Sequence, residues 1–390
     1  MRILYSHRTK SSDGQAVHIR SLTEALVRRG HDLAIVGPDA ESPGERPLDA
    51  AAGIGWRRHL PPAIHEAAEL AYSVPAYWRL AARARAFAPD VLYERYNLYF
   101  HSGVRLARRR GLPFLLEVNS PLAEERERHG NLSLKSIARV SEASIWRAAD
   151  RVLPVTQALA SYVEKAGVDP ARIEVIPNGV EAIFLRAHDP RPVRLRYGLE
   201  GKIVLGFTGF VREWHGLERV ISYLGERRRS DVAFLIVGDG DARHELEKQA
   251  LALGVKESVI FTGVVQREEV PAHLAAFDIA LQPAVTAYAS PLKLFEYMAA
   301  GRAILAPDAP NIREILGERG DAALLVAGDD AALFSALDAL VADADLRMTL
   351  GAAARETLLR RGFTWDANAE RVEKIAELEI ARRLTPAVML

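Results

Sequence analysis

The chain of 390 residues contains no cysteine, which excludes disulfide bonds, thiol nucleophiles and zinc sites built on cysteine. It carries no net formal charge, with 51 Lys and Arg residues against 51 Asp and Glu residues, which argues against a general nucleic-acid-binding protein. Nowhere do about eighteen uncharged apolar residues follow one another, so we expect no membrane-spanning helix. The start, MRILYSHRTK, has too short an apolar run for a signal peptide. Together with the missing cysteines, this favours a cytoplasmic protein.

Two motif absences narrow the function further. No GxGxxG motif follows an expected strand, which counts against a dinucleotide-dependent oxidoreductase. The 11 histidines show no HExxH or comparable ligand spacing, so we expect no bound metal. What remains is a chain of ordinary globular composition, with 49% hydrophobic and 26% charged residues.

Short β-rich runs alternate with amphipathic helical runs almost throughout, which predicts doubly wound parallel sheets of the α/β class. A chain of 390 residues exceeds what one core usually serves, so we expect two Rossmann-like domains at 1–185 and 186–365, with a helix at 366–390 that packs back on the first. The strands expected in the first domain are 2–7, 32–37, 90–94, 113–118, 151–155 and 173–177. Those expected in the second are 202–207, 232–238, 258–263, 278–283, 302–307 and 322–327. Helices are expected over 63–88, 98–110, 133–149 and 156–166.

The segment SPLKLFEYMAAG (290–301) is the most informative stretch of the chain. Ser290 is expected to cap a helix whose first position is Pro291. The N–H groups of Leu292 and Lys293 then favour an anion such as a diphosphate, and Lys293 adds a formal charge. One turn later, Glu296 suits a ribose diol. The alternative is an ordinary capped helix with a surface lysine and glutamate.

Three other loops in the second half also follow expected strands, where ligands bind to parallel sheets, and we expect them to face a cleft between the domains. In FTGFVREWHG (207–216), Gly209 allows close approach of a ligand, and Arg212 and His215 precede a helix. Arginine binds phosphate in a bidentate manner. These residues are expected to bind the diphosphate.

The remaining two loops are VGDG (237–240) and FTGVV (261–265). The first predicts a tight turn at Gly238, with Asp239 capping the next helix. In the second, backbone groups around Val264 are expected to contact the base. The four loops together would hold a nucleoside diphosphate.

The order GFVREWHG, VGDG, FTGV and SPLKLFEYMAAG resembles the retaining glycosyltransferases with a GT-B fold, in the large family (family 4) that includes bacterial mannosyl- and glucosyltransferases of surface polysaccharides. IPNGV (176–180) and the pair Gly30–His31 match the same family, so the resemblance covers nearly the whole chain. It implies transfer of a hexose from a nucleoside diphosphate sugar with retained configuration and without a metal or other cofactor. The acceptor would be a glycan, a glycolipid or a small molecule, and Arg212 and Lys293 would carry most of the catalysis.

This chain departs from the family pattern at two positions. The family's Glu-x7-Glu motif keeps its second glutamate as Glu296, but Tyr288 replaces the first, which contacts the donor hexose. His215 stands where the family usually has a lysine, and Lys293 is expected to act as the second cation. Asp-x-Asp, which binds a divalent metal in other glycosyltransferases, occurs at 239–241 and 343–345. We interpret the first as part of the VGDG turn and the second as part of a charged terminal helix.

In the first domain, EVNSPL (117–122) ends a strand where the family often has a histidine at the reaction centre. Asn119 takes that position, and Glu117 would face the same side, where a carboxylate stabilises positive charge on the sugar ring. The alternative is that Glu117 pairs with Arg95. Gly14 is expected to let the first loop approach the diphosphate across the cleft.

Arginines cluster in the first half, together with several aromatic residues. This pattern favours either contact with the anionic inner membrane face, where a lipid-linked acceptor would approach, or a solvated helix face. The arginines concerned are Arg57, Arg58, Arg79, Arg83, Arg85, Arg105, Arg108, Arg109 and Arg110. Besides a glycosyltransferase, the sequence leaves open a GT-B-fold epimerase or phosphorylase and a non-enzymatic two-lobed sugar-binding protein.

Overall fold

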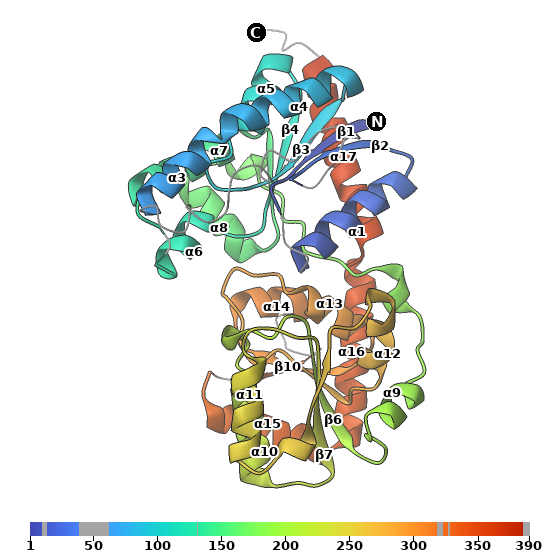
Figure 1. The fold of residues 1–390 in the computed structure, drawn as a ribbon. Coiled ribbons are helices and arrows are strands. Elements are labelled where there is room, and N and C mark those ends of the chain that lie inside the picture. Colours follow the sequence, from blue (N-terminus) through green and yellow to red (C-terminus); the bar gives the residue numbers. More distant parts are fainter. Residues whose placement is uncertain (10–13, 39–61, 131, 318–322, 327, 385–390) are drawn as a thin grey trace. The chain divides into compact units, whose positions relative to one another are not determined.

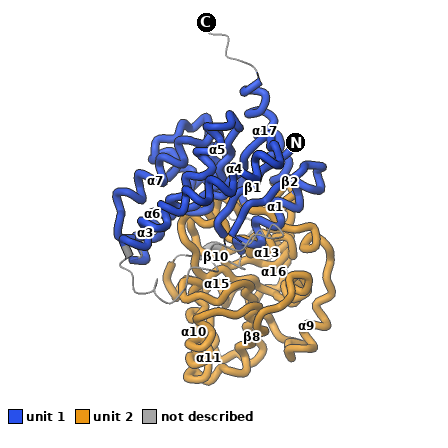
Figure 2. Tube along the Cα trace, turned by 45° about the horizontal axis from the view of Figure 1, so that its top comes forward, with its two compact units in different colours: residues 1–177, 366–390 blue, residues 178–365 orange. Residues whose placement is uncertain are grey.

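The computed structural model describes residues 1–390 except 10–13, 39–61, 131, 318–322, 327 and 385–390 (Figure 1). The chain forms two compact units, and each has its own parallel sheet (Figure 2). Unit 1 consists of Met1–Pro177 and Asp366–Leu390, and unit 2 consists of Asn178–Trp365. None of the described helices combines the length and the apolar character needed to cross a bilayer.

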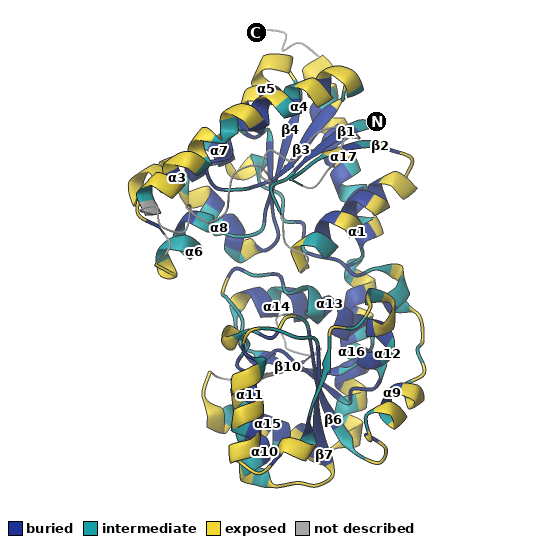
Figure 3. Ribbon diagram, in the orientation of Figure 1, coloured by how far each residue is buried: buried dark blue, intermediate teal, exposed yellow. Residues whose placement is uncertain are grey.

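Unit 1 is built on a five-stranded parallel sheet in the order β2-β1-β3-β4-β5. Every residue of β3 and β4 is buried, as expected where helices cover both faces of a parallel sheet (Figure 3). The strands are β1 (Arg2–Ser6), β2 (Asp32–Val36), β3 (Val91–Arg95), β4 (Phe114–Val118) and β5 (Arg151–Pro154).

Nine described helical segments belong wholly or mainly to unit 1. They are α1 (Gly14–Arg28), α3 (Pro62–Ala71), α4 (Ser73–Phe87), α5 (Ser102–Arg110), α6 (Leu122–Arg128), α7 (Lys135–Ala148), α8 (Gln157–Lys165), η1 (Pro170–Arg172) and α17 (Trp365–Leu384). Although α17 is the last of the described helices, it packs in unit 1. There Arg151 of β5 lies 2.7 Å from the Glu379 carboxylate in a largely buried ion pair.

Unit 2 contains a six-stranded parallel sheet in the order β11-β10-β9-β6-β7-β8. Its strands are β6 (Ile203–Thr208), β7 (Val232–Val237), β8 (Val259–Gly263), β9 (Ile279–Leu281), β10 (Ala303–Pro307) and β11 (Leu324–Val326). Its α-helices are α9 (Arg191–Arg196), α10 (Leu217–Arg227), α11 (Arg243–Ala252), α12 (Val270–Ala275), α13 (Leu292–Ala299), α14 (Pro310–Leu316), α15 (Asp330–Ala342) and α16 (Ala344–Arg361). Short 3-10 turns complete it: η2 (Ala182–Leu185), η3 (Glu213–His215), η4 (Lys256–Ser258) and η5 (Arg267–Glu269).

Two expected elements differ from the structure, and proline explains both. The helix expected over 63–88 is two helices, because Pro75 lacks an N–H and its ring conflicts with the carbonyl of Ala71, where α3 ends. The strand expected over 173–177 makes only an isolated bridge to β5, between Val152 and Ile173. Pro154 has no N–H with which to continue that ladder.

Candidate functional site

The four loops singled out in the second half of the chain follow strands of a single sheet in unit 2. The strand order of this sheet reverses between β6 and β9, which are neighbours although three strands apart in sequence. Such a reversal is where parallel α/β sheets bind ligands, beyond the carboxyl ends of the strands. Arg212 and His215 follow β6, while Lys293 and Glu296 lie on α13, the helix after β9.

The loops after β6 and β7 pack backbone against backbone. Gly209 N donates to Val237 O at 2.9 Å, and Val211 N donates to Asp239 O at 3.0 Å. A Cβ atom on Gly238 would overlap the carbonyl oxygen of Gly209, and both glycines have positive φ angles, 139° and 121°. Only glycine fits at position 238, because it has no Cβ and adopts a positive φ readily. Glycine there lets the loops after β6 and β7 pack closely.

A cluster of cationic and aromatic side chains lies next to these two loops. Lys293 Nζ lies 3.4 Å from His215 Nε2 and 4.1 Å from the centre of the Phe207 ring. The aliphatic end of Lys293 also runs directly beside the position that a Cβ of Gly209 would take. Arg212 pairs with Asp241 at 2.7 Å and remains about one-third exposed. Lys293 thus lies beside Gly209, and the charges of both Lys293 and Arg212 act on His215.

Two groups in this cluster have strongly shifted pKa values. Burial lowers the pKa of Lys293 to about 7, although the carboxylate of Glu296 opposes the shift. Burial, with the positive charges of Lys293 and Arg212, lowers the pKa of His215 to about 3. His215 is therefore a neutral imidazole at physiological pH. With a pKa of about 7, Lys293 is only partly protonated at neutral pH, and an anionic ligand would favour its cationic form.

The start of α13 differs from the expected cap. Pro291 is itself the N-cap residue, and no side chain accepts a hydrogen bond from the first turn. Ser290 instead serves unit 2 elsewhere: its Oγ accepts from Asn178 N at 3.3 Å, and its carbonyl accepts from the Asn178 amide at 2.6 Å. The expected cap was wrong, yet the N–H groups of Leu292 and Lys293 still open the helix.

Tyr297 fixes α13 relative to the sheet. Its hydroxyl accepts from Thr208 N at 2.9 Å, at the last residue of β6, and it lies 3.4 Å from the carbonyl oxygen of Leu281, the last residue of β9. The tyrosine therefore bridges the two strands that flank the reversal.

Glu296 is not isolated, because Arg267 lies against it. Arg267 Nη2 is 2.6 Å from Glu296 Oε1, and the same guanidinium also binds Glu181. Burial raises the pKa of Glu296, while the contact with Arg267 counteracts that rise. Sequence reasoning missed both Arg267 and Glu181. Neither stands in a local motif that predicts contact with α13.

The structure also shows where the other residues singled out in the sequence, Asp239, Asp343 and Val264, lie. Asp239 does not cap α11, whose N-cap is Ala242; its carboxylate accepts from Gly240 N at 2.8 Å and from Arg243 at 3.0 Å. Asp343 lies outside the terminal helix, as the N-cap of α16. Val264 is 81% exposed just beyond β8.

The described part of the chain contains no cluster of metal-binding side chains. No group of three or more histidine, aspartate or glutamate side chains there could hold a metal ion. In the Asp-x-Asp triplet at 239–241, Arg243 and Arg212 take one carboxylate each.

In unit 1, Glu117 is almost fully buried within a set of four donors. Arg95 and Asn119 bind its Oε1, the latter at 2.5 Å, and Tyr93 and His18 approach its Oε2 at 2.9 and 3.0 Å. Burial alone would raise the pKa of Glu117, but His18 and Arg95 hold it well below its usual range. The geometry matches the pairing with Arg95, and partly exposed Asn119 is the outer member of the cluster.

Gly14 and the arginines expected at a membrane surface are not among the side chains that contact Glu117. Gly14 is the exposed first residue of α1 rather than part of a loop. Arg57 and Arg58 lie outside the described residues. Several other arginines stack on aromatic rings of α4 and its neighbourhood: Arg79 on Tyr72, Arg83 on Phe87, and Arg105 and Arg109 on Tyr77. Trp78 of the same helix is 63% exposed.

Family models match both halves of the chain. Residues 13–179 match the model described as glycosyl transferase 4-like domain, and residues 202–343 match the model of glycosyl transferases group 1. The two matches together take in most of unit 1 and most of the sheet of unit 2.

Individual proteins match over long stretches. The chain is 30% identical over 265 residues to a GDP-mannose-dependent alpha-(1-6)-phosphatidylinositol monomannoside mannosyltransferase of Mycolicibacterium smegmatis, covering 64% of this chain and 67% of the relative. It is 25% identical over 403 residues to a D-inositol 3-phosphate glycosyltransferase of Acidothermus cellulolyticus, covering 96% and 87%. Among solved structures, Anabaena HepE in complex with UDP matches with a TM-score of 0.75 at 16% identity, over 97% of this chain and 100% of that one. This last likeness supports the GT-B fold.

Proposed function

Since this chain belongs to the glycosyltransferases of family 4, we propose that it transfers a hexose from a nucleoside diphosphate sugar to a glycan, glycolipid or small-molecule acceptor, with retention of configuration and without a metal. The observation that carries the proposal is the convergence of Arg212, Lys293 and the uncapped start of α13 at the strand reversal of unit 2. A diphosphate there would meet two cations and two outward N–H groups.

The described site suits a leaving diphosphate better than a neutral ligand. A buried lysine whose pKa is about 7 becomes fully cationic when an anion approaches. Neutral His215 adds a hydrogen-bonding group beside that cation without adding repulsion. Fixed positive charge stabilises the negative charge that grows on the diphosphate as the sugar bond breaks, and one such donor contributes about 2–4 kcal/mol.

In the proposed reaction, the bond between the anomeric carbon and the β-phosphate oxygen breaks, and its electron pair stays on the diphosphate. A hydroxyl of the acceptor attacks the same face of the sugar, and its proton passes to the departing phosphate oxygen. The products are the glycosylated acceptor and a protonated nucleoside diphosphate. In this scheme Arg212 and Lys293 carry the electrostatic stabilisation, and no protein nucleophile is needed.

Glu117 has a positioning role in this proposal rather than a place at the reacting atoms. Both of its oxygens already accept two hydrogen bonds or ion pairs each. Asn119 keeps the candidate role toward the sugar, because one of its amide hydrogens is held by Glu117 while its oxygen is not engaged by that contact. Because the amide nitrogen of Asn119 is held by Glu117, the direction of its amide oxygen is fixed too.

We propose that the donor carries UDP or GDP and that the acceptor is a polyol, free or lipid-linked. HepE binds UDP, and the mycobacterial relative uses GDP-mannose and acts on a phosphatidylinositol mannoside. A lipid-linked acceptor would bring unit 1 to the anionic inner membrane face. The arginines and exposed Trp78 of α4 and α5 have the composition that such a surface attracts.

The test is donor turnover. The protein is incubated with uridine, guanosine and adenosine diphosphate sugars, with and without lipid extract and with excess chelator, and released nucleotide is measured. We expect release with at least one donor, and a loss of about 30- to 1,000-fold in Arg212→Ala. The anomeric configuration of the product, read by nuclear magnetic resonance, distinguishes retention from inversion.

The matched control is Arg229→Ala. Arg229 also forms an arginine–aspartate pair on the surface of unit 2, with Asp231 at 2.6 Å, but it precedes β7 at the opposite end of the sheet. Its substitution should leave release unchanged. Equal losses in the two variants, or release that requires manganese, would contradict the proposed site.

A further inference from the structure

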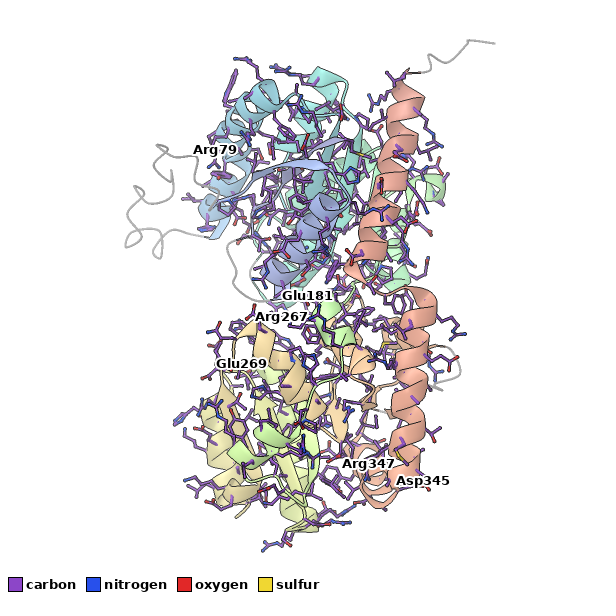
Figure 4. The ribbon with its side chains drawn as sticks, turned by 90° about the vertical axis from the view of Figure 1, so that its right-hand side faces the viewer. Arg79, Glu181, Arg267, Glu269, Asp345 and Arg347 are labelled. Carbon is purple, nitrogen blue, oxygen red and sulfur yellow. The ribbon has the colours of Figure 1, made fainter. Side chains whose placement is uncertain are left out.

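Arg267 joins two carboxylates that come from distant parts of unit 2. Its Nη2 lies 2.6 Å from Oε1 of Glu296 on α13, and its Nε lies 3.2 Å from Oε1 of Glu181, just before η2. Figure 4 shows Glu181 and Arg267 side by side. The guanidinium also lies over the ring of Phe184, 4.5 Å from its centre. Three segments, η2, η5 and α13, therefore meet at one side chain.

The contacts with Glu181 and Phe184 hold the guanidinium plane in one orientation. A guanidinium is a rigid planar fork, so once its Nε edge and its face are fixed, the direction of Nη2 is fixed too. Nη2 then contacts both Oε2 of Glu181 and Oε1 of Glu296, a side chain only 5% exposed. Among the described residues, no protein donor contacts Oε2 of Glu296. One oxygen is thus held by the protein, and the other is left for a ligand.

Arg267 also solves an electrostatic problem of the site. Glu296 lies one helical turn from Lys293, where a diphosphate is proposed to bind, and a bare carboxylate would repel that ligand. The guanidinium offsets this charge locally. It also opposes the rise in the pKa of Glu296 that burial causes, without reversing it, and so favours the ionised carboxylate, which accepts hydrogen bonds from hydroxyl groups.

We propose that Arg267 is the positioning residue that makes the site selective for a ribose diol: it holds Oε1 of Glu296 so that Oε2 is directed at the sugar hydroxyls of the nucleotide. The proposal rests on the proposed function, and Arg267 itself touches no ligand. The competing explanation is that Arg267 only pins η5 to η2 and stabilises unit 2.

Calorimetric titration separates the two explanations. Wild type and Arg267→Gln are titrated with uridine, guanosine and adenosine diphosphates, with their 2′-deoxy and 3′-deoxy counterparts, and with inorganic pyrophosphate. We expect wild type to prefer one ribonucleotide over its deoxy forms by about 10-fold or more, since a hydrogen bond to a charged group is lost. In Arg267→Gln the affinity for the ribonucleotide should fall about 10- to 100-fold, while the affinity for pyrophosphate should change by less than about 3-fold. The preference for ribose should fall to near one.

Arg194→Gln is the matched control, because Arg194 forms a similarly exposed ion pair in the same unit, with Asp278 at 2.7 Å. It should lower the melting temperature without changing the ribose preference. Glu181→Gln provides a second test if Arg267→Gln does not fold: it loosens the guanidinium but keeps Glu296, and should reduce the preference partially. Arg267→Lys should recover part of the preference, because it restores the charge without the fork.

Three results would overturn the inference. A ribose preference that survives in both Arg267→Gln and Glu181→Gln would show that the arginine does not act through Glu296. Equal weakening of nucleotide and pyrophosphate would assign it a purely structural role. Failure of wild type to bind any of the nucleotides would refute the proposed function as well, which distinguishes that failure from the first two.

Discussion

The ammonium nitrogen of Lys293 lies 3.4 Å from Nε2 of His215, and burial has lowered the pKa of both side chains. The lowered pKa indicates that the protein does not fully compensate the charge of this buried lysine, which an anionic ligand would do. The imidazole beside it is neutral, so it neither repels the ammonium strongly nor replaces the counter-ion. If a nucleotide binds here as proposed, its binding should be linked to the uptake of a proton by Lys293.

Binding of a nucleoside diphosphate should weaken as the pH rises above about 7, by up to tenfold per pH unit. The protonated lysine is the form that binds, and its pKa of about 7 in the unliganded protein means that a proton must be taken up at higher pH. Titration calorimetry in two buffers of different ionisation enthalpy measures that uptake. Lys293→Met should bind weakly and show no pH dependence above pH 7. Constant affinity of the wild type between pH 7 and 9 would contradict the assignment.

Glu117→Gln should destabilise unit 1 by about 3–5 kcal/mol, because it leaves Arg95 buried without its carboxylate. The pKa of Glu117 is held below its usual range, so its stabilisation is present above about pH 4.5 and is lost as the pH falls further. Urea unfolding at pH 7 and at pH 4 measures both effects. Glu124→Gln on α6 is the control, because Glu124 also pairs with an arginine, Arg128, but is not buried. If Glu117→Gln kept full stability but lost transfer activity, the carboxylate would act at the sugar instead.

Gly238→Ala should lower the melting temperature and weaken nucleotide binding. The added methyl group would overlap the Gly209 carbonyl, and φ at this position is 139°. We expect a cost of about 1–3 kcal/mol from overpacking and backbone strain. Gly254→Ala is the comparison, because Gly254 also has a positive φ, 71°, but no neighbouring atom near the new methyl group. Similar losses in both variants would show that overlap between the loops is unimportant.

Glu94→Gln should make the stability of unit 1 less dependent on pH. Burial raises the pKa of Glu94 to about 8, and its Oε2 accepts from Ser6 Oγ at 2.9 Å. The folded protein therefore keeps a proton that the unfolded chain releases near pH 4.5. That stabilisation is complete below about pH 4.5 and declines as the pH rises through 8. Denaturant curves of both proteins at pH 5 and pH 8 should diverge; parallel behaviour would show that Glu94 titrates normally.

The candidate site could be predicted from the sequence where its residues stand together in one loop or one helical turn. Arg212 and His215 stand in one loop after a strand, and Lys293 and Glu296 lie within one helical turn, so their mutual proximity follows from local geometry. The role expected for Ser290 was wrong because Pro291 is the N-cap, and the serine hydroxyl accepts from Asn178, which is distant in sequence. The cap expected at Asp239 was also wrong, but its partners are local: Gly240 N and the side chain of Arg243, the first residue of α11, donate to its carboxylate.

The sequence by itself determined the α/β alternation, because buried parallel strands and amphipathic helices have different periods that can be read locally. It also identified the family, because the motifs keep their order along the chain. Only the tertiary structure decided the partners of the ionisable groups: Arg267 pairs with Glu181, which lies 86 positions away in the sequence, and with Glu296. Contacts over such separations depend on how strands are ordered in the sheet, and the burial that shifts the pKa of Lys293 exists only after that sheet has formed.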